Sequence, residues 1–443
     1  YGESLTATYK IFDEILRERG IKAEDRFDIE IGIVDYDKTL ANFTESLEKH
    51  PEWVKSLVDF LLKKKGLVLM SGSKLSSQAK RLVTPIMDEL KKRNYTPEQI
   101  KTIMTEKFGP LYGDGVASRY DVVGMDAQGN LTWKVNKEYT ESHIIPADKD
   151  KNELKIIETA LTKIIGDYNN SLDLVKDKEK KGGGGDPLKK LIEATYIPSS
   201  VAEKWDPAKL IRPAKLDPRG FYIKKGAEEW ITPTEEPNVK EDYEYKVTQM
   251  AIMDMFVAAI DDVFIKEEAK EVRGKYNFLK KVREEIEKGF VNKFGNELGK
   301  EKASQYEIIH GGSPDGFTIE VTRKVEGNPI TKETAMIDFL KNVAPQKGVG
   351  PEKIGYIGDE FIKNPKLPHP YNDWSIYVSQ DPLVKRIKIF AVNYHIKHEF
   401  FQAPEEFIEE AKKEGSRLFY APLSGYGESL TATYKIFDEI LRE

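Results

Sequence analysis

Three short apolar runs, each followed at once by polar residues, constrain the fold of this chain more than any other feature. The runs and the polar residues that follow them are 29–34 with Asp35, 67–70 with Ser71, and 354–357 with Asp359. Because each run is short and precedes a helical pattern, we expect buried parallel strands of an α/β sheet. Ligands of open α/β sheets bind beyond the carboxyl ends of the strands. The sequence therefore predicts a site of carboxylates and hydroxyls at that edge.

Similar patterns predict the rest of this α/β core. Further elements are helices at 45–65, 74–93 and 333–342, strands at 387–392 and 418–420, and a hairpin within 115–135. The length of 443 residues indicates two or three domain-sized units.

Composition excludes several classes of function. The 69 basic and 75 acidic residues leave a net charge of -6, so no basic field indicates a nucleic-acid partner. The absence of cysteine excludes disulfides, thiolate catalysis and cysteine metal sites. No apolar run approaches the about 18–20 residues of a membrane span, and no signal-peptide pattern follows Tyr1. We therefore expect no membrane partner and, by default, a cytoplasmic location.

The polar residues at the strand ends belong to four motifs that occur in a characteristic order. These are Asp35-x-Asp37-x-Thr39, then Ser71-Gly72, then Lys332 at a helix start, then Gly358-Asp359. This order resembles the haloacid dehalogenase superfamily, through scattered motifs rather than continuous similarity. The resemblance implies a Rossmann-like, three-layer α/β core with a parallel sheet, and a large helix-rich cap inserted between the second and third motifs. It also implies a magnesium-dependent phosphatase.

The resemblance assigns the central chemistry to the first motif. It implies that Asp35 is the nucleophile that forms an aspartyl-phosphate, and that Asp37 is the general acid and base. Magnesium prefers oxygen ligands, which Asp35, Asp37 through its backbone carbonyl, and Asp359 would supply. The alternative for Asp35 and Asp37 is a solvated turn after a strand.

Other motif residues would bind the substrate phosphate. The residues expected to do so are Thr39, Ser71, Gly72, Ser73 and Lys332. Lys332 would also offset the charge of the crowded carboxylates during catalysis. The alternatives are a helix N-cap for Ser71 and a solvated lysine at a helix start for Lys332.

The fourth motif departs from the simplest pattern of the superfamily. A second acid usually follows Gly-Asp closely, but here a longer insertion separates Asp359 from Asn372-Asp373. This spacing resembles phosphomannomutases and some nucleotide 5′-phosphatases of the superfamily. We expect Asp373 in the metal shell, with Glu360 as the competing candidate.

The segment between the second and third motifs is much longer than a sheet crossover needs. The expected organisation is an N-terminal helix at 1–27, a core at 28–137 and 319–425, a cap at 138–318, and a second copy of the N-terminal helix at 426–443. Within the cap, residues 306–322 predict a β-hairpin and the apolar stretch at 250–260 predicts a helix.

Six basic residues cluster in the predicted cap, namely Lys209, Arg212, Lys215, Arg219, Lys224 and Lys225. They either bind a second anionic group or a stacked base, or lie in a solvated loop. Gly182–Gly185 follow a charged run at 176–181 and predict a flexible surface linker.

Residues 1–18 recur without change at 426–443. The repeated segment predicts an amphipathic helix with Leu5, Tyr9 and Phe12 on one face. Since one such helix per core is expected, two copies compete for one groove. An undiverged repeat indicates an engineered feature. The alternative is a copy that displaces the other or docks on a neighbouring molecule, as in a helix-swapped homo-oligomer.

The sequence thus predicts a magnesium-dependent phosphomonoesterase for a small phosphorylated metabolite, either a sugar phosphate or a nucleoside 5′-monophosphate. One alternative is a phosphomutase of the phosphomannomutase type, which needs a basic cap site for a second phosphate. The other is a noncatalytic α/β scaffold for binding or assembly.

Overall fold

The computed structural model describes ten ranges of the chain: 27–41, 46–147, 152–180, 213–253, 278–313, 316–361, 373–392, 403–413, 415–424 and 429–442. The chain divides into two compact units. Unit 1 comprises 1–136, 227–238 and 331–443, and unit 2 comprises 137–226 and 239–330.

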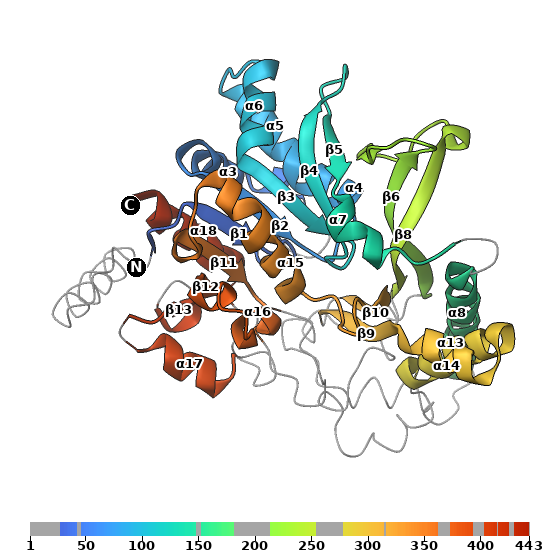
Figure 1. Ribbon diagram of the computed structural model, residues 1–443. Helices are drawn as coiled ribbons and strands as arrows, with labels where there is room; N and C mark the ends of the chain where they lie inside the picture. Colours follow the sequence, from blue (N-terminus) through green and yellow to red (C-terminus); the bar gives the residue numbers. More distant parts are fainter. Residues whose placement is uncertain are drawn as a thin grey trace. The chain divides into compact units, whose positions relative to one another are not determined.

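Unit 1 is built on a sheet of nine strands within the described ranges, in the order β13-β12-β11-β1-β2-β3-β4-β5-β7 (Figure 1). The strands are β1 (Ile31–Val34), β2 (Gly66–Met70), β3 (Phe108–Gly113), β4 (Ser118–Met125), β5 (Leu131–Val135), β7 (Ile231–Thr232), β11 (Ile354–Gly358), β12 (Lys388–Ala391) and β13 (Leu418–Tyr420). The six strands from β13 to β3 run parallel, which confirms the predicted parallel sheet. Antiparallel β4, β5 and β7 extend it at one edge, and β4 with β5 forms the predicted core hairpin.

The helices of unit 1 lie between these strands in the chain, except α18, which follows the last of them. They are α3 (Pro51–Lys63), α4 (Leu75–Gln78), α5 (Thr84–Lys92), α6 (Pro97–Lys107), α15 (Lys332–Asp338), α16 (Trp374–Val378), α17 (Glu405–Ala411) and α18 (Ser429–Arg442). The predicted helix at 74–93 is interrupted by a π-helical turn at Ala79–Val83. Pro85 follows this turn and has no N–H to donate to the carbonyl of Arg81, which loosens the helix there.

Helices cover both faces of the sheet. A side chain at Gly32 of β1 would meet Phe60 of α3 and Phe437 of α18, so these helices lie on one face. The strand register places Tyr112 of β3 on the opposite face, where its hydroxyl donates to Asp338 of α15. The sheet is therefore the middle layer of the three-layer α/β core that the sequence predicts.

Unit 2 is a four-stranded antiparallel sheet packed against helices. The strands are β6 (Lys215–Lys224), β8 (Tyr243–Met253), β9 (Tyr306–Ser313) and β10 (Gly316–Arg323), in the order β6-β8-β10-β9. The helices are α7 (Lys137–Thr140), α8 (Glu153–Lys180), α13 (Phe278–Phe294) and α14 (Asn296–Ser304). Residues from α8, α13 and the sheet form one apolar core, with Leu161, Val282 and Ile319 at its centre. The predicted hairpin at 306–322 is confirmed by the pairing of β9 with β10.

Two sequence predictions for this region were wrong. Residues 250–253, the start of the predicted helix at 250–260, form the end of strand β8 instead. A short run buried between two neighbouring strands is apolar on both faces, so its period does not distinguish a strand from a helix. Residues 215–224 form strand β6 rather than a solvated loop. Lys209, Arg212 and residues 254–260 lie outside the described ranges.

The boundaries of the two units differ from the predicted core and cap. Unit 2 extends to residue 330 rather than ending at 318, because β10 pairs along its whole length with β9 and over 318–322 with β8. Residues 227–238 belong to unit 1, because Thr232 of β7 pairs with Trp133 of β5. Local sequence patterns identify strands but not their distant partners, which is why these boundaries needed the structure.

The second copy of the repeated segment forms helix α18, as predicted. The first copy lies outside the described ranges, as do Gly182–Gly185. The charged run before these glycines is helical up to Lys180, at the end of α8. Within the described ranges, none of the helices combines the length and the hydrophobicity of a membrane span.

Candidate active site

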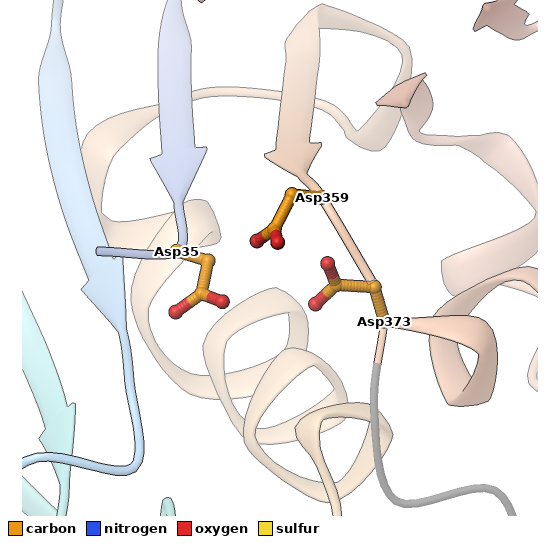
Figure 2. A group of neighbouring side chains, drawn as sticks. All are labelled: Asp35, Asp359 and Asp373. Atoms are coloured by element: carbon orange, nitrogen blue, oxygen red, sulfur yellow. The ribbon is translucent and has the colours of Figure 1, made fainter. Parts of the chain in front are cut away.

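Three aspartates meet at the carboxyl edge of the parallel sheet. Asp35 follows β1, Asp359 follows β11, and Asp373 directly precedes α16. Their carboxylates point toward one another (Figure 2), and one oxygen of each lies within 4.8 Å of the others. All three residues are buried. Because β1 and β11 are neighbouring parallel strands, the fold itself brings Asp35 and Asp359 together.

Asp373 is fixed from several sides. Its Oδ1 accepts hydrogen bonds from Lys332 Nζ at 2.5 Å and from the Tyr356 hydroxyl, and its Oδ2 accepts one from the backbone N–H of Glu360 at 2.8 Å. A Cβ atom at Gly358 would lie only 2.2 Å from this carboxylate, so the glycine allows the close approach. The structure thus places Asp373, rather than the Glu360 side chain, with the other two aspartates among the described residues.

Lys332 links the carboxylates. It is the first residue of α15, whose start is fixed by a capping box between Thr331 and Thr334. Its Nζ donates to Asp35 Oδ2 at 2.8 Å as well as to Asp373. Since Lys332 is only 8% exposed, the alternative of a solvated lysine at a helix start does not hold.

The cluster holds more negative than positive charge. Burial raises the free-energy cost of that excess negative charge. The pKa of Asp35 is raised to about 7, mainly by burial and also by nearby Asp373, although Lys332 opposes both. Burial also raises the pKa of Asp359 well above its ordinary value, with added repulsion from Glu360 and Asp35. Burial alone would lower the pKa of Lys332, but Asp35 and Asp373 outweigh it, so that pKa is raised.

Asp37 lies beside this cluster, with its carboxylate held by two donors. Arg81 donates to Oδ1 at 2.7 Å, and the Ser73 hydroxyl donates to Oδ2 at 3.2 Å. Arg81 also lies over the Tyr36 ring, 4.3 Å from its centroid. The Tyr36 hydroxyl donates to the Arg81 carbonyl at 3.2 Å. These contacts connect the π-helical turn between α4 and α5 to the Asp35 loop.

The remaining predicted phosphate-binding residues lie nearby. Ser71 is buried, and its hydroxyl accepts a hydrogen bond from the backbone N–H of Ser73 at 3.3 Å. The backbone carbonyls of Gly72 and Ser73 accept from the loop after β3. Thr39 instead donates its hydroxyl to Asp359 Oδ1 at 2.9 Å. In this structure Thr39 therefore orients an acid of the cluster.

The sequence prediction missed three residues at this site. Lys38 is buried with a backbone φ of 64°, and its charge lowers the pKa of Asp359. Arg81 and Tyr356 contact Asp37 and Asp373 respectively. Lys38 lies inside the first motif, so the sequence offered a reason to consider it. Arg81 lies on a helical segment and Tyr356 on a strand, and no nearby sequence pattern marks either as a site residue.

The donor set fits a hard divalent cation. Magnesium takes oxygen ligands, and three converging carboxylates offer them together with an excess of negative charge that a cation would neutralise. Histidine is absent from the group and the chain contains no cysteine, so softer transition metals are poorly matched.

The four motifs thus lie where the sequence resemblance expects them, three of them at the ends of β1, β2 and β11 and one at the start of α15. The chain thus has the three-layer α/β arrangement that this resemblance implies. Neither a protein-family model nor a curated protein matches it.

Solved structures that match this chain at low sequence identity and low TM-score include two named phosphatases and a hydrolase. A truncated IMP-nucleotidase of Plasmodium falciparum is 13% identical over 75% of this chain, at a TM-score of 0.34, and this chain spans only 62% of its length. The trehalose-6-phosphate phosphatase of Aspergillus fumigatus is 8% identical, with 94% of this chain and 96% of that chain covered and a TM-score of 0.34. A HAD/COF-like hydrolase of Plasmodium vivax is 10% identical with the same coverages and TM-score.

Proposed function

We propose that this protein is a magnesium-dependent phosphomonoester hydrolase that works through an aspartyl-phosphate on Asp35. The observation that supports this most is the buried group of Asp35, Asp359 and Asp373 at the sheet edge, where Lys332 pairs with both Asp35 and Asp373. A structural ion pair needs no such excess of carboxylate, whereas a site for a metal and a phosphate does.

The residues that would hold magnesium are Asp35, Asp359 and Asp373 through their carboxylates and Asp37 through its backbone carbonyl. When bound, the ion would neutralise these carboxylates and polarise the substrate phosphate. Lys332 would bind a phosphate oxygen and favour the ionised form of Asp35, because its ammonium group already contacts Asp35 Oδ2 at 2.8 Å.

In the first chemical step, one carboxylate oxygen of Asp35 attacks phosphorus and the ester P–O bond breaks. Asp37 gives its proton to the departing ester oxygen, so the product leaves as an alcohol. For this, the Asp37 carboxyl must turn away from Arg81 and Ser73, which hold it in the present structure. In the second step Asp37 takes a proton from water, the water oxygen attacks phosphorus, and the bond to Asp35 breaks.

The proposed substrate is a small phosphorylated metabolite, a sugar phosphate or a nucleoside 5′-monophosphate. Ser71, Gly72 and Ser73 are proposed to bind its phosphate together with Lys332, and Thr39 to support them through Asp359. Unit 2 interrupts the chain between Ser71 and Lys332, which is the position of a substrate-selecting cap. We keep a cytoplasmic location and the absence of a nucleic-acid partner as predictions.

The direct test is the Asp35→Asn variant, assayed for release of phosphate from an aryl phosphate with magnesium or with a chelator. We expect a loss of at least about a thousandfold in kcat, because the nucleophile is removed. The matched control is Asp88→Asn, which replaces a half-exposed carboxylate that pairs with Lys91 on the surface. It should retain full activity and the same fold by circular dichroism.

Other outcomes would favour the alternatives. Absence of activity in the unmodified protein across a broad panel of phosphorylated metabolites would favour a noncatalytic scaffold. Conversion of a hexose 1-phosphate into the 6-phosphate would favour a phosphomutase. Full activity of the Asp35→Asn variant would exclude the proposed nucleophile.

A further inference from the structure

Helix α18 completes unit 1 by filling a groove next to the first strand. Tyr434 stacks on Trp53 of α3 with ring centroids 4.6 Å apart, and Phe437 meets Phe60 edge-on at 5.0 Å. Phe437 is fully buried and Tyr434 nearly so. Removing such aromatic side chains from water stabilises a fold by about 2–3 kcal/mol each, so the groove requires an occupant.

The seated helix also contacts the loop of the first motif. The Tyr434 hydroxyl donates to the backbone carbonyl of Leu40 at 3.1 Å. Leu40 in turn donates its N–H to the carbonyl of Tyr36, next to Asp35. Occupation of the groove is therefore linked by hydrogen bonds to the segment that bears the proposed nucleophile.

The direction of α18 allows either end of the chain to supply this helix. Tyr434 lies at Leu40, beyond the carboxyl end of β1, whereas Phe437 packs near Gly32 within β1. The helix therefore runs antiparallel to β1. It begins at the edge where parallel β13 ends and finishes toward the start of β1. This is the position of a crossover helix, which joins the end of one parallel strand to the start of another.

The segment at 1–18 has the same sequence and precedes β1 in the chain. Residues 4–17 correspond to 429–442, so Tyr9 corresponds to Tyr434 and Phe12 to Phe437. In the same orientation, residue 17 would lie toward the start of β1, and residues 18–30 would connect it to that strand. An extended connection of this length spans roughly 40 Å, which is ample.

We propose that residues 4–17 and 429–442 are interchangeable occupants of this one groove within a single molecule. Exchange of the helix between two molecules offers no advantage. Two chains have two grooves and four copies of the segment, whether each groove holds a helix of its own chain or of the other chain. The intermolecular form would only lose translational and rotational freedom. Within one molecule, the tether keeps the competing copy at a millimolar effective concentration.

Cysteine cross-linking tests the proposal, because the chain has no cysteine of its own. Ser56 of α3 lies next to Asp438, with their side-chain oxygens 3.3 Å apart. The paired substitutions Ser56→Cys and Asp438→Cys should give an intramolecular disulfide that reports α18 in the groove. Ser56→Cys with Asp13→Cys reports the other copy in the groove, since Asp13 corresponds to Asp438.

Adding Phe437→Asp should move the occupancy. We expect the disulfide to Asp438→Cys to fall at least about tenfold and the intramolecular disulfide to Asp13→Cys to appear, since a buried carboxylate excludes α18 from the groove. The matched control is Phe12→Asp, which should leave the disulfide to Asp438→Cys intact. A Phe437→Asp chain that forms only intermolecular disulfides, or none to Asp13→Cys, would overturn the proposal.

A second variant covers the case in which Phe437→Asp unfolds the protein. A chain ending at Gly425 lacks α18 but keeps residues 1–18, and we expect it to fold as a monomer by circular dichroism and gel filtration. Adding Phe12→Asp to that chain should then unfold it. If the shortened chain is itself unfolded, the first copy does not replace α18 and the proposal fails. None of these measurements depends on phosphatase activity.

Discussion

Glu153 in unit 2 and Asp373 in unit 1 are buried carboxylates with similar partners. Glu153 accepts from Lys302 at 2.7 Å and from the Tyr306 hydroxyl at 2.5 Å. Asp373 likewise accepts from a lysine, Lys332, and from the hydroxyl of a tyrosine. The two differ in what else the lysine contacts.

Among the described residues Lys302 pairs with one carboxylate, so the cluster around Glu153 is balanced. Lys332 serves both Asp35 and Asp373, and Asp359 stands within 4.8 Å of them. A balanced buried pair holds two elements together, whereas an excess of buried carboxylate is tolerated only with protonation or with an added cation. The number of carboxylates for each cation therefore separates a structural cluster from a proposed active site.

The largest expected difference concerns the two lysines. Lys332→Met should lower kcat/KM by about a thousandfold, because it removes a cation that stabilises the transferring phosphoryl group. Lys302→Met should leave kcat/KM within about twofold and lower the free energy of unfolding by about 3 kcal/mol, since it strands a buried carboxylate. Kinetics and urea titration of both variants measure this, and an equal loss of activity in the two would erase the distinction.

Magnesium should stabilise the protein through the cluster of Asp35, Asp359 and Asp373, and not through the cluster around Glu153. At a concentration about 100 times its Kd, the ion should raise the free energy of unfolding by about 2.7 kcal/mol. Asp359→Asn should lose this gain, because it removes a ligand, whereas Glu153→Gln should keep it. Thermal unfolding with and without magnesium reports the effect. Retention of the full gain in Asp359→Asn would place the ion elsewhere.

Magnesium affinity should also depend on pH. Burial raises the pKa of Asp35 to about 7, so below that pH a proton must leave before the carboxylate can bind the ion. The affinity should therefore be greatest above pH 7 and fall about fivefold from pH 7 to pH 6. Calorimetric titration at both values measures it. An affinity that rises on acidification would contradict the proposed ligand.

The smallest effects are expected at the two tyrosines. Tyr306→Phe and Tyr356→Phe should each lower the free energy of unfolding by about 1 kcal/mol, the value of one buried hydrogen bond. Only Tyr356→Phe should change magnesium affinity, because its hydroxyl shares Asp373 with the proposed metal site. Identical magnesium affinity in both variants and in the unmodified protein would argue against a role of Asp373 in metal binding.

Several features of the site were predictable because their signals are local. Buried parallel strands are apolar along their whole length, so β1, β2 and β11 could be found together with Asp35, Ser71 and Asp359 at their ends. The helix start at Lys332 was also visible. The amphipathic pattern of the repeated segment predicted α18 and its buried face, including Tyr434 and Phe437.

Other features depend on distant parts of the chain. Asp373 and Glu360 were the two candidates to join Asp35 and Asp359. Gly358 favours Asp373, because its missing side chain leaves room for the Asp373 carboxylate. The contact of Arg81 with Asp37 rests on how α4 and α5 pack beside the first loop. The end of strand β8 was mistaken for a helix because burial on both faces hides the alternation that marks an exposed strand.

The sequence by itself determined the parallel strands, the order of the four motifs and the kinds of oxygen ligands present, because each depends on a few neighbouring residues. Only the tertiary structure decided which acids converge, that Lys332 is buried between two of them, and that one groove accepts the repeated helix. Those features depend on contacts between residues far apart in the chain, whose distances and shared burial are fixed only when the sheet and its helices pack together.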